Sequence, residues 1–167
     1  ALWIAAEHDP GVEPAASLAA LHDLQREISA NLPMLPLCEL AQPLLRQLNA
    51  LGFQQDEYHP LRPHAAMMDK VLQRRRGQPL TLAILALELA RRLSIPLEGV
   101  GFPGHFLLRI ETDEGPLALD PFSEGRVVLP SELTRRALHA GLTQFLLQTL
   151  HHIGIGAEIV VCFQSCQ

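Results

Sequence analysis

The sequence predicts an α+β fold in which one buried helix packs against a small antiparallel sheet. In the first half of the chain, apolar residues recur at three- and four-residue spacing, which is typical of helices. The segment from Pro79 to Leu93 is apolar on nearly every side, as expected for a helix that other elements cover. From Leu97 onward, short β-prone runs alternate with Gly, Pro and Asp. Helices followed by antiparallel strands indicate the α+β class.

Composition limits the kinds of protein to consider. With 167 residues, of which 48% are hydrophobic and 19% charged, the chain is long enough for one domain with a substantial core. A net charge of -5 argues against a nucleic-acid partner, which would need an excess of cations to neutralise phosphates. No apolar run reaches the roughly 18 residues of a membrane span, so we expect no membrane partner. We expect no signal peptide, because the amino-terminal apolar stretch lacks a basic flank. The three cysteines do not suggest a disulfide framework, and a cytoplasmic protein without a cofactor is expected.

Periodicity and turn residues place the elements of the amino-terminal half. We expect helices over 14–31, 37–50 and about 65–76. Pro43 should kink the second helix or split it into two short helices. The polar stretch from Gln54 to His64 is expected to be a loop, and Gly77 to end the third helix.

In the second half, Pro79 suits the first turn of a helix, where its missing N–H costs nothing. Strands are expected over Leu97–Gly101, His105–Glu111, Pro116–Asp120 and Arg126–Leu129, with a hairpin turn at 112–115. Ser131 is expected to cap a helix, and a further helix is expected over 141–152.

These elements divide the chain into three parts within a single compact domain. The expected parts are an amino-terminal helical region over 1–60, a core over 61–130 and a carboxy-terminal part over 131–167.

His105 and Asp120 are the most informative pair of residues. If the hairpin pairs Glu111 with Pro116, Leu107 faces Asp120, and His105 lies two residues further along on the same face. Such neighbours lie about 7–8 Å apart at Cβ. A histidine oriented by a carboxylate is the base half of a nucleophilic triad. The pair also fits a structural role, with a histidine at a strand end and an aspartate before a turn.

The nucleophile of such a triad should lie near the positive end of a helix, which stabilises a thiolate. The expected buried helix opens with Gln78, Pro79, Leu80 and Thr81, without a cysteine. Thr81 supplies the hydroxyl of this turn, although a threonine within a helix more often bonds to its own backbone. Cys38, in the amino-terminal helical part, is expected to pack in the core rather than to act as a nucleophile. We expect the His–Asp pair to lie beside this turn.

Further side chains are candidates for binding. Arg109 shares the expected face of His105, where it could pair with a carboxylate of the chain or of a substrate. The other binding candidates lie next to the expected catalytic residues in the sequence: Gln78, Pro79 and Phe106. The arginine run 74–76 fits the last turn of a helix better than a site for an acidic partner.

A metal site is not expected. The cysteines Cys162 and Cys166 follow the adjacent histidines His151 and His152. Adjacent histidines point apart, and no fixed scaffold joins the four side chains, whereas a structural zinc site needs four well-placed ligands.

Three segments, 71–83, 90–97 and 99–109, carry a specific pattern together with Asp120-Pro121-Phe122. They include Arg-Gly-Gln-Pro-Leu-Thr, Arg-Leu-Ser-Ile-Pro and Pro-Gly-His-Phe-Leu-Leu-Arg. In these segments the chain resembles the SirB-type invasion-regulator family. These are bacterial proteins with a transglutaminase-like core, usually followed by tetratricopeptide-like helices. The resemblance covers about residues 1–145 and implies a papain-like fold.

The resemblance also implies roles for individual residues. In the wider transglutaminase-like superfamily, a cysteine opens the central helix, a histidine begins a strand and an aspartate ends the next strand. His105 and Asp120 match the last two positions. By spacing, the cysteine falls on Pro79, which cannot be a nucleophile, so the resemblance implies the fold and puts cysteine chemistry in doubt.

The chain departs from the family in two segments. Residues 58–65 lack the Asn-Ser pair that relatives usually carry. Past about residue 150, where relatives continue into helical repeats, residues 153–167 are β-prone and show no repeat. We hypothesise a truncated or frame-altered homologue.

Two functions stay open. The first is a non-catalytic regulatory or protein-interaction protein that kept the fold and binds a protein partner. The second is an amide hydrolase or acyl transferase in which His105 is the base, Asp120 orients it, and Thr81 or a water attacks. Threonine nucleophiles usually rely on an N-terminal amine as the base, which Thr81 lacks, and this favours the first function.

Overall fold

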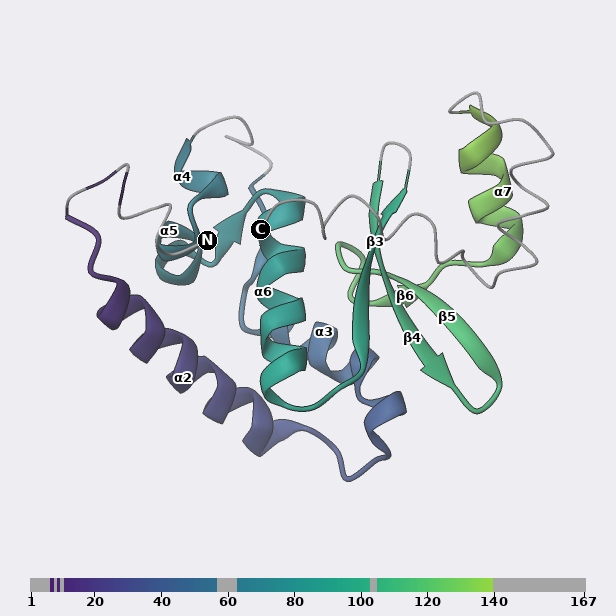
Figure 1. Cartoon of the computed structure of the whole chain (residues 1–167), viewed down its shortest axis with the longest axis horizontal. Coiled ribbons are helices and arrows are strands. Elements are labelled where there is room, and N and C mark those ends of the chain that lie inside the picture. Colours follow the sequence, from purple (N-terminus) through teal and green to yellow (C-terminus); the bar gives the residue numbers. More distant parts are fainter. Residues whose placement is uncertain (1–6, 8, 10, 57–62, 103–104, 140–167) are drawn as a thin grey trace.

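A computed structural model describes residues 7, 9, 11–56, 63–102 and 105–139. A helical half packs beside a four-stranded antiparallel sheet in the order β3-β4-β5-β6, and a last helix lies beyond the sheet (Figure 1). The helices are α2 (Pro14–Asn31), η1 (Leu37–Glu39), α3 (Ala41–Ala50), α4 (Pro63–Ala66), α5 (Met68–Arg74), α6 (Pro79–Arg92) and α7 (Pro130–His139). The strands are β1 (Gln54–Gln55), β2 (Arg76–Gly77), β3 (Leu97–Phe102), β4 (His105–Thr112), β5 (Gly115–Asp120) and β6 (Arg126–Val127). The predicted α+β class is confirmed.

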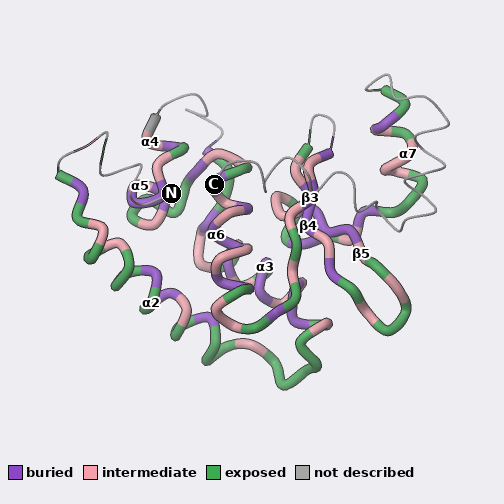
Figure 2. The backbone as a smooth tube through the Cα atoms, in the orientation of Figure 1, coloured by how far each residue is buried: buried purple, intermediate pink, exposed green. Residues whose placement is uncertain are grey.

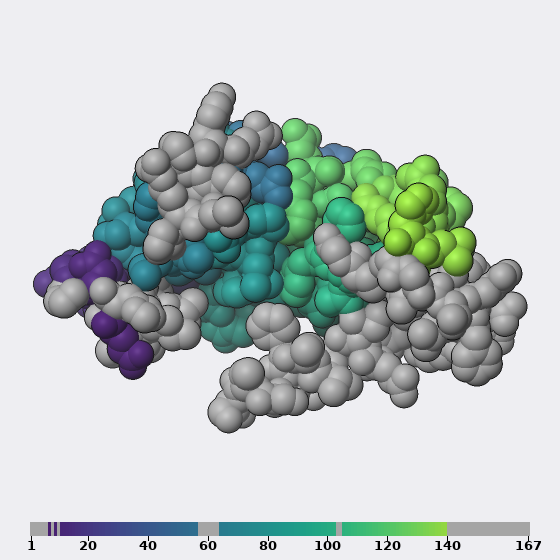
Figure 3. All heavy atoms as spheres, turned by 90° about the horizontal axis from the view of Figure 1, so that it is seen from above, coloured from purple at the N-terminus to yellow at the C-terminus, as the bar shows by residue number. Residues whose placement is uncertain are grey.

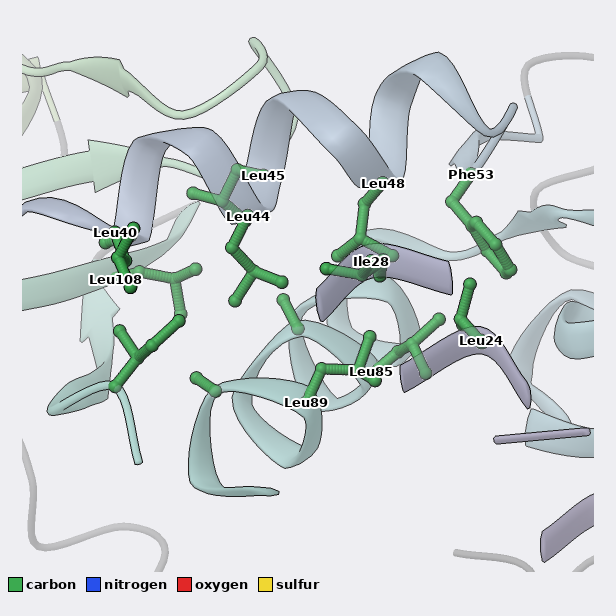
Figure 4. Close-up of a cluster of buried hydrophobic side chains, with 14 of the residues drawn as sticks. Leu24, Ile28, Leu40, Leu44, Leu45, Leu48, Phe53, Leu85, Leu89 and Leu108 are labelled. Atoms are coloured by element: carbon green, nitrogen blue, oxygen red, sulfur yellow. The ribbon is translucent and has the colours of Figure 1, made fainter. Parts of the chain in front are cut away.

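Helix α6 is the buried centre of the helical half. It begins at Pro79, as predicted, and its inner residues are apolar on nearly every side. Leu89 is fully buried, and Leu85 is 2% exposed. Both side chains lie opposite Leu44 and Leu48 of α3 (Figure 4). The other side of the helix packs against β3 and β4, so α6 joins the two halves of the molecule.

A tight turn at the end of α6 sends the chain into the sheet. Ser94 has a left-handed backbone with φ 59°. The N–H of Ile95 donates to the carbonyl of Ala90 at 2.8 Å, and that of Ser94 donates to Arg91. This pair of bonds is the Schellman arrangement, here with serine in the place usually taken by glycine. The side chain of Ile95 is buried, which anchors the start of β3 against the helix.

The register of the hairpin β4–β5 agrees with the sequence prediction. Glu111 pairs with Pro116, and Thr112 pairs with Gly115 across a two-residue turn. Because successive residues of a strand point to opposite faces, this register fixes the face of every side chain in the hairpin.

Each face of the sheet has its own apolar cluster. On one face, Leu108, Ile110 and Leu119 join the large core around α6. On the other face, Leu107 and Ala118 pack with Ala137 of α7. Buried positions therefore run through α6 and both faces of the central strands, whereas most of α2 is exposed (Figure 2).

The structure corrects several predicted boundaries. The segment 37–50 is split into η1 and α3, with the break just before Ala41, so that Pro43 lies in the first turn of α3, where its missing N–H is harmless. The predicted loop after Gln54 contains β1, which pairs in parallel with β2. The helix predicted over 65–76 is broken into α4 and α5 and ends at Arg74. The last helix starts at Pro130, so Ser131 lies inside its first turn rather than at its cap.

Three predictions fall outside the described residues. They are the helix over 141–152, the nature of the tail 153–167, and the arrangement of the histidines and cysteines considered for zinc. The proposed division into parts at residues 60 and 130 stays a prediction. In the described structure, helices α2 and α3 share one core with α6 and the sheet.

Replacing Leu89 with alanine should lower the free energy of unfolding by about 2–5 kcal/mol, because it leaves a cavity in the centre of the core. Leu80→Ala is the matched control, since Leu80 lies on the same helix and is 44% exposed. Its effect should stay below about 1 kcal/mol. Urea denaturation followed by circular dichroism measures both, and equal losses would contradict the central position of Leu89.

Candidate functional site

The topology brings the predicted site residues to one end of the sheet. Strand β3 runs back along α6, and β4 runs antiparallel to β3, so β4 begins at the end of the molecule where α6 begins. Strand β5 is antiparallel to β4 and ends beside the start of β4. His105 opens β4 and Asp120 closes β5. The same end of the fold therefore holds the first turn of α6 and both predicted partners.

The register places His105 and Asp120 on one face of the sheet. Leu108 pairs with Leu119, so the next position of the ladder sets Leu107 opposite Asp120. His105 is two residues from Leu107 and shares its face. The predicted pair requires this register, because shifting the pairing of β4 and β5 by one residue would place His105 and Asp120 on opposite faces of the sheet.

The carboxylate of Asp120 is engaged by other groups. One oxygen accepts the backbone N–H of Phe122 at 3.0 Å. The other lies 3.9 Å from a guanidinium nitrogen of Arg136 on α7. The side chain of Asp120 is nearly buried, whereas His105 is exposed. Among the described residues no hydrogen bond or ion pair joins the two, so a His–Asp catalytic pair stays a prediction.

Asp120 belongs to a chain of ion pairs that holds α7. Glu132 contacts Arg126 at 2.9 Å and Arg136 at 2.6 Å. Arg126 is the register partner of Asp120 in β6, and Arg136 reaches back to the Asp120 carboxylate. Arg126, and with it Arg136, lowers the pKa of Glu132 from its ordinary value of 4.5 to about 2. The ionised glutamate thus links the end of the sheet to the helix beyond it.

The first turn of α6 carries no free nucleophile. Pro79 takes the first helical position, and Gln78 precedes it as the cap residue. The hydroxyl of Thr81 is nearly buried and donates to the carbonyl of Ala66 at 3.3 Å. The predicted bond to the helix's own backbone is replaced by this contact with α4. The apolar contacts of α6 lie on the sheet face opposite to the one that holds Leu107 and Asp120.

Cys38 does not supply the missing thiol at this turn. It lies half-buried in η1. Leu40, which follows η1 directly, packs beside Leu108 in the middle of β4 (Figure 4). Cys162 and Cys166 lie outside the described residues. In the described ranges, no group of three or more His, Cys, Asp or Glu side chains is close enough together to hold a metal ion.

The remaining candidates have structural contacts. Arg109 pairs with Glu98 of β3 at 3.0 Å and also with Glu111, so carboxylates of the chain itself contact this guanidinium. Phe106 points to the helical side of the sheet. A Cβ added at Gly99 would come within 2.7 Å of its ring and 3.1 Å of Leu87, which shows how closely the ring fits between strand and helix.

A cleft that the sequence did not predict lies between α6, α3 and β1. It has a volume of about 590 Å³ and is bounded by α3, by β1 and the residues around it, by Arg74 and Arg76, and by the turn that follows Asp120. Its lining combines apolar and polar side chains: Leu45, Leu48, Asn49, Phe53, Gln54, Gln55, Asp56, Arg74, Arg76, Leu82, Leu85, Ala86, Pro121 and Phe122. Clefts of about 300–1,000 Å³ are typical of ligand sites.

Two residues of the arginine run, Arg74 and Arg76, line this cleft. Arg74 pairs with the buried carboxylate of Asp56 at 3.1 Å. Arg75 has a left-handed backbone with φ 56°, donates to the carbonyl of Leu51 at 2.7 Å and lies over the ring of Phe53. Arg76 belongs to β2 and contacts the side-chain oxygen of Gln54. The prediction that all three arginines form the last turn of a helix was wrong, because the chain turns at Arg75.

The chain resembles a known protein family over most of its length. The model of the transglutaminase-like superfamily matches residues 15–153. The chain belongs to the transglutaminase-like superfamily. A UPF0162 protein of Pseudomonas aeruginosa is 50% identical over 131 residues, which cover 78% of this chain and 48% of that protein. Protein SirB1 of Salmonella typhimurium is 43% identical over 60 residues, or 35% of this chain and 22% of that protein. The predicted resemblance to the SirB-type family is confirmed.

Part of the chain also resembles a segment of a much longer protein. F-box only protein 21 of Homo sapiens is 46% identical over 66 residues, which are 40% of this chain and 10% of that protein. The chain itself spans about half the length of the UPF0162 relative from Pseudomonas aeruginosa. No solved structure gives a significant match. No described helix is long and apolar enough to cross a membrane.

Acid should loosen the contact between the sheet and α7. Because folding lowers the pKa of Glu132 to about 2, its ionised form stabilises the fold above pH 4.5, and this contribution is lost as the pH falls from 4.5 through 2. Glu132→Gln should therefore lower the thermal midpoint at pH 7 and flatten its decline below pH 4.5. Glu114→Gln, an exposed change in the hairpin turn, is the control. A variant curve parallel to the wild-type curve would exclude the role assigned to Glu132.

Gly125→Ala should destabilise the turn that forms one wall of the cleft. Gly125 has φ +71°, and an added Cβ would lie 2.8 Å from the side chain of Leu45. Backbone strain and overpacking together should cost about 2–4 kcal/mol. A Leu45→Ala background removes the contact with Leu45 Cδ1 but keeps the one with Cβ at 2.9 Å. The cost of Gly125→Ala should therefore fall in this background, yet stay above the backbone part of about 1–2 kcal/mol. Chemical denaturation of the four proteins of this cycle gives the coupling, and additive effects would rule out the contact.

Proposed function

We propose that this transglutaminase-like chain is a non-catalytic regulatory or protein-interaction module. The observation that carries the proposal is the first turn of α6, which opens with Pro79. By the spacing of the resemblance, this is the position of the superfamily's cysteine. A proline has no group that can attack a carbonyl. The opening turn of the central helix therefore lacks the thiol that acyl transfer in this superfamily requires.

The contacts of the other catalytic candidates support the proposal. The Thr81 hydroxyl is committed to the Ala66 carbonyl and has no base beside it among the described groups. The Asp120 carboxylate accepts a backbone N–H and faces an arginine, which is the environment of a turn-stabilising residue. His105 is exposed at the start of its strand and makes no ion pair with a described carboxylate. We therefore propose that Thr81 and Asp120 stabilise the fold, that His105 is a surface residue, and that the three do not form a catalytic unit.

The relatives also support use as a module. The matched region of F-box only protein 21 is a tenth of that protein, and the UPF0162 relative is about twice as long as the matched segment. A fold that occurs inside longer chains suits a role in recognition. The net charge of -5 favours a protein partner over a polyanion.

An amine-incorporation assay tests the absence of catalysis. Purified wild-type chain is incubated with dansylcadaverine and dimethylcasein, and release of ammonia and labelling of casein are measured. Wild type, His105→Ala and Thr81→Val should all stay at the background level. Activity in the wild type that His105→Ala abolishes would establish the alternative, an acyl transferase or amide hydrolase. Release of ammonia without labelling of casein, retained in Thr81→Val, would then identify water as the attacking group.

A capture experiment tests the interaction role with the same variant. Proteins retained by immobilised wild-type chain and by His105→Ala should be the same, because a scaffold does not need the imidazole. Accumulation of a covalent adduct on either protein would contradict the proposal.

A further inference from the structure

We infer that the cleft between α3, β1 and α6 binds a partner segment that carries an apolar side chain next to a carboxylate. This inference rests on the proposed function and names the kind of peptide that the module would recognise. It differs from the predicted site, because His105, Asp120 and Thr81 are not among the residues that line the cleft.

The floor of the cleft provides the apolar part of the site. Leu48 and Phe53 come from α3 and the segment after it, and Leu82 and Leu85 come from the flank of α6. Leu48, Phe53 and Leu85 lie together in Figure 4, where α3 and α6 approach each other. An apolar side chain of one or two residues fits a hollow of about 590 Å³.

The rim of the cleft provides the charge. Arg74 is balanced by Asp56, but Arg76 contacts the neutral side-chain oxygen of Gln54. Within the described residues Arg76 has no carboxylate at ion-pair distance. This guanidinium without a counter-charge stands out on a chain whose net charge is -5. Arginine's planar donors suit a carboxylate partner.

The wall that holds Arg74 and Arg76 is tied to the rest of the chain by hydrogen bonds and close packing. Asp56 donates its backbone N–H to Gly77 at 3.0 Å, which fixes the end of β1 against β2. A Cβ added at Gly77 would come within 2.7 Å of Val71, so β2 lies directly on α5. The left-handed turn at Arg75 sets the direction in which the chain leaves α5 for β2. A preformed wall reduces the ordering cost of binding.

The helical and sheet halves border each other along this side of the molecule. In the view from above, the teal surface of the helical half lies beside the green surface of the strands (Figure 3). The turn with Pro121 and Phe122 brings the sheet half into the lining of the cleft. A peptide in the cleft would therefore touch both halves.

Fluorescence anisotropy with a designed peptide pair tests the inference. The probe is fluorescein-labelled Gly-Leu-Phe-Glu-Asp-Gly, and its partner has Gln and Asn in place of the two acids. The acidic peptide should bind about three- to fivefold more tightly than the amide peptide, the ratio expected for an exposed ion pair. A third peptide with Ala-Ala in place of Leu-Phe should bind more weakly than both.

Matched arginine variants locate the binding. Arg76→Gln should weaken the acidic peptide about three- to fivefold and leave the amide peptide unchanged. Arg135→Gln removes an exposed arginine of α7 and should change neither. Amide cross-peaks of residues 53–56 and 82–86 should shift on titration in a heteronuclear NMR spectrum.

The outcomes separate this inference from the proposed function. Absence of binding, equal affinity for the acidic and amide peptides, or an equal effect of both arginine variants would overturn the inference. Tighter binding of a deca-thymidine oligonucleotide that Arg76→Gln abolishes would also overturn it, in favour of a nucleic-acid site. Labelling of casein by the wild type would overturn the proposed function alone, since the cleft does not include the catalytic candidates.

Discussion

The structure depends on the burial of α6 from more than one side. A helix that is apolar around most of its circumference needs an apolar partner on each flank. Here α3 covers one flank and the sheet covers another, and Leu85, Ala86, Leu89 and Ala90 are almost fully buried as a result. The two ends of the helix are equally constrained. Pro79 begins it, and the turn at Ser94 reverses the chain so that β3 runs back along the helix.

Asp120, predicted from the sequence as a partner of His105, has contacts that stabilise the fold. Its carbonyl accepts the N–H groups of Ser123 and Gly125, and its carboxylate accepts that of Phe122. These bonds shape the turn that packs on Leu45 of α3 and forms one wall of the cleft. Because the same carboxylate faces Arg136, it also joins the sheet to α7. Asp120 therefore connects the end of β5, the turn that follows it and α7.

The sequence was least informative where short elements meet. A two-residue strand such as β1 has no detectable periodicity, so the stretch after Phe53 could only be expected to be a loop. Arginines before a glycine favour the end of a helix, and the left-handed turn at Arg75 has no local signal of its own. Its contacts with Leu51 and Phe53 are made across 24 and 22 positions of the chain, which local patterns do not report. The cleft was missed for this reason.

By itself the sequence determined the α+β class, the buried helix from Pro79, the hairpin register that sets His105 and Asp120 on one face, and the lack of a thiol at Pro79. These features follow from local causes: periodicity, turn length and the chemistry of single side chains. The tertiary structure decided which groups the predicted side chains contact, namely Phe122 and Arg136 for Asp120, and Ala66 for Thr81. It also created the cleft beside the arginines. Those contacts join segments far apart in the chain, and only the packing of α3, α6 and the sheet brings them together.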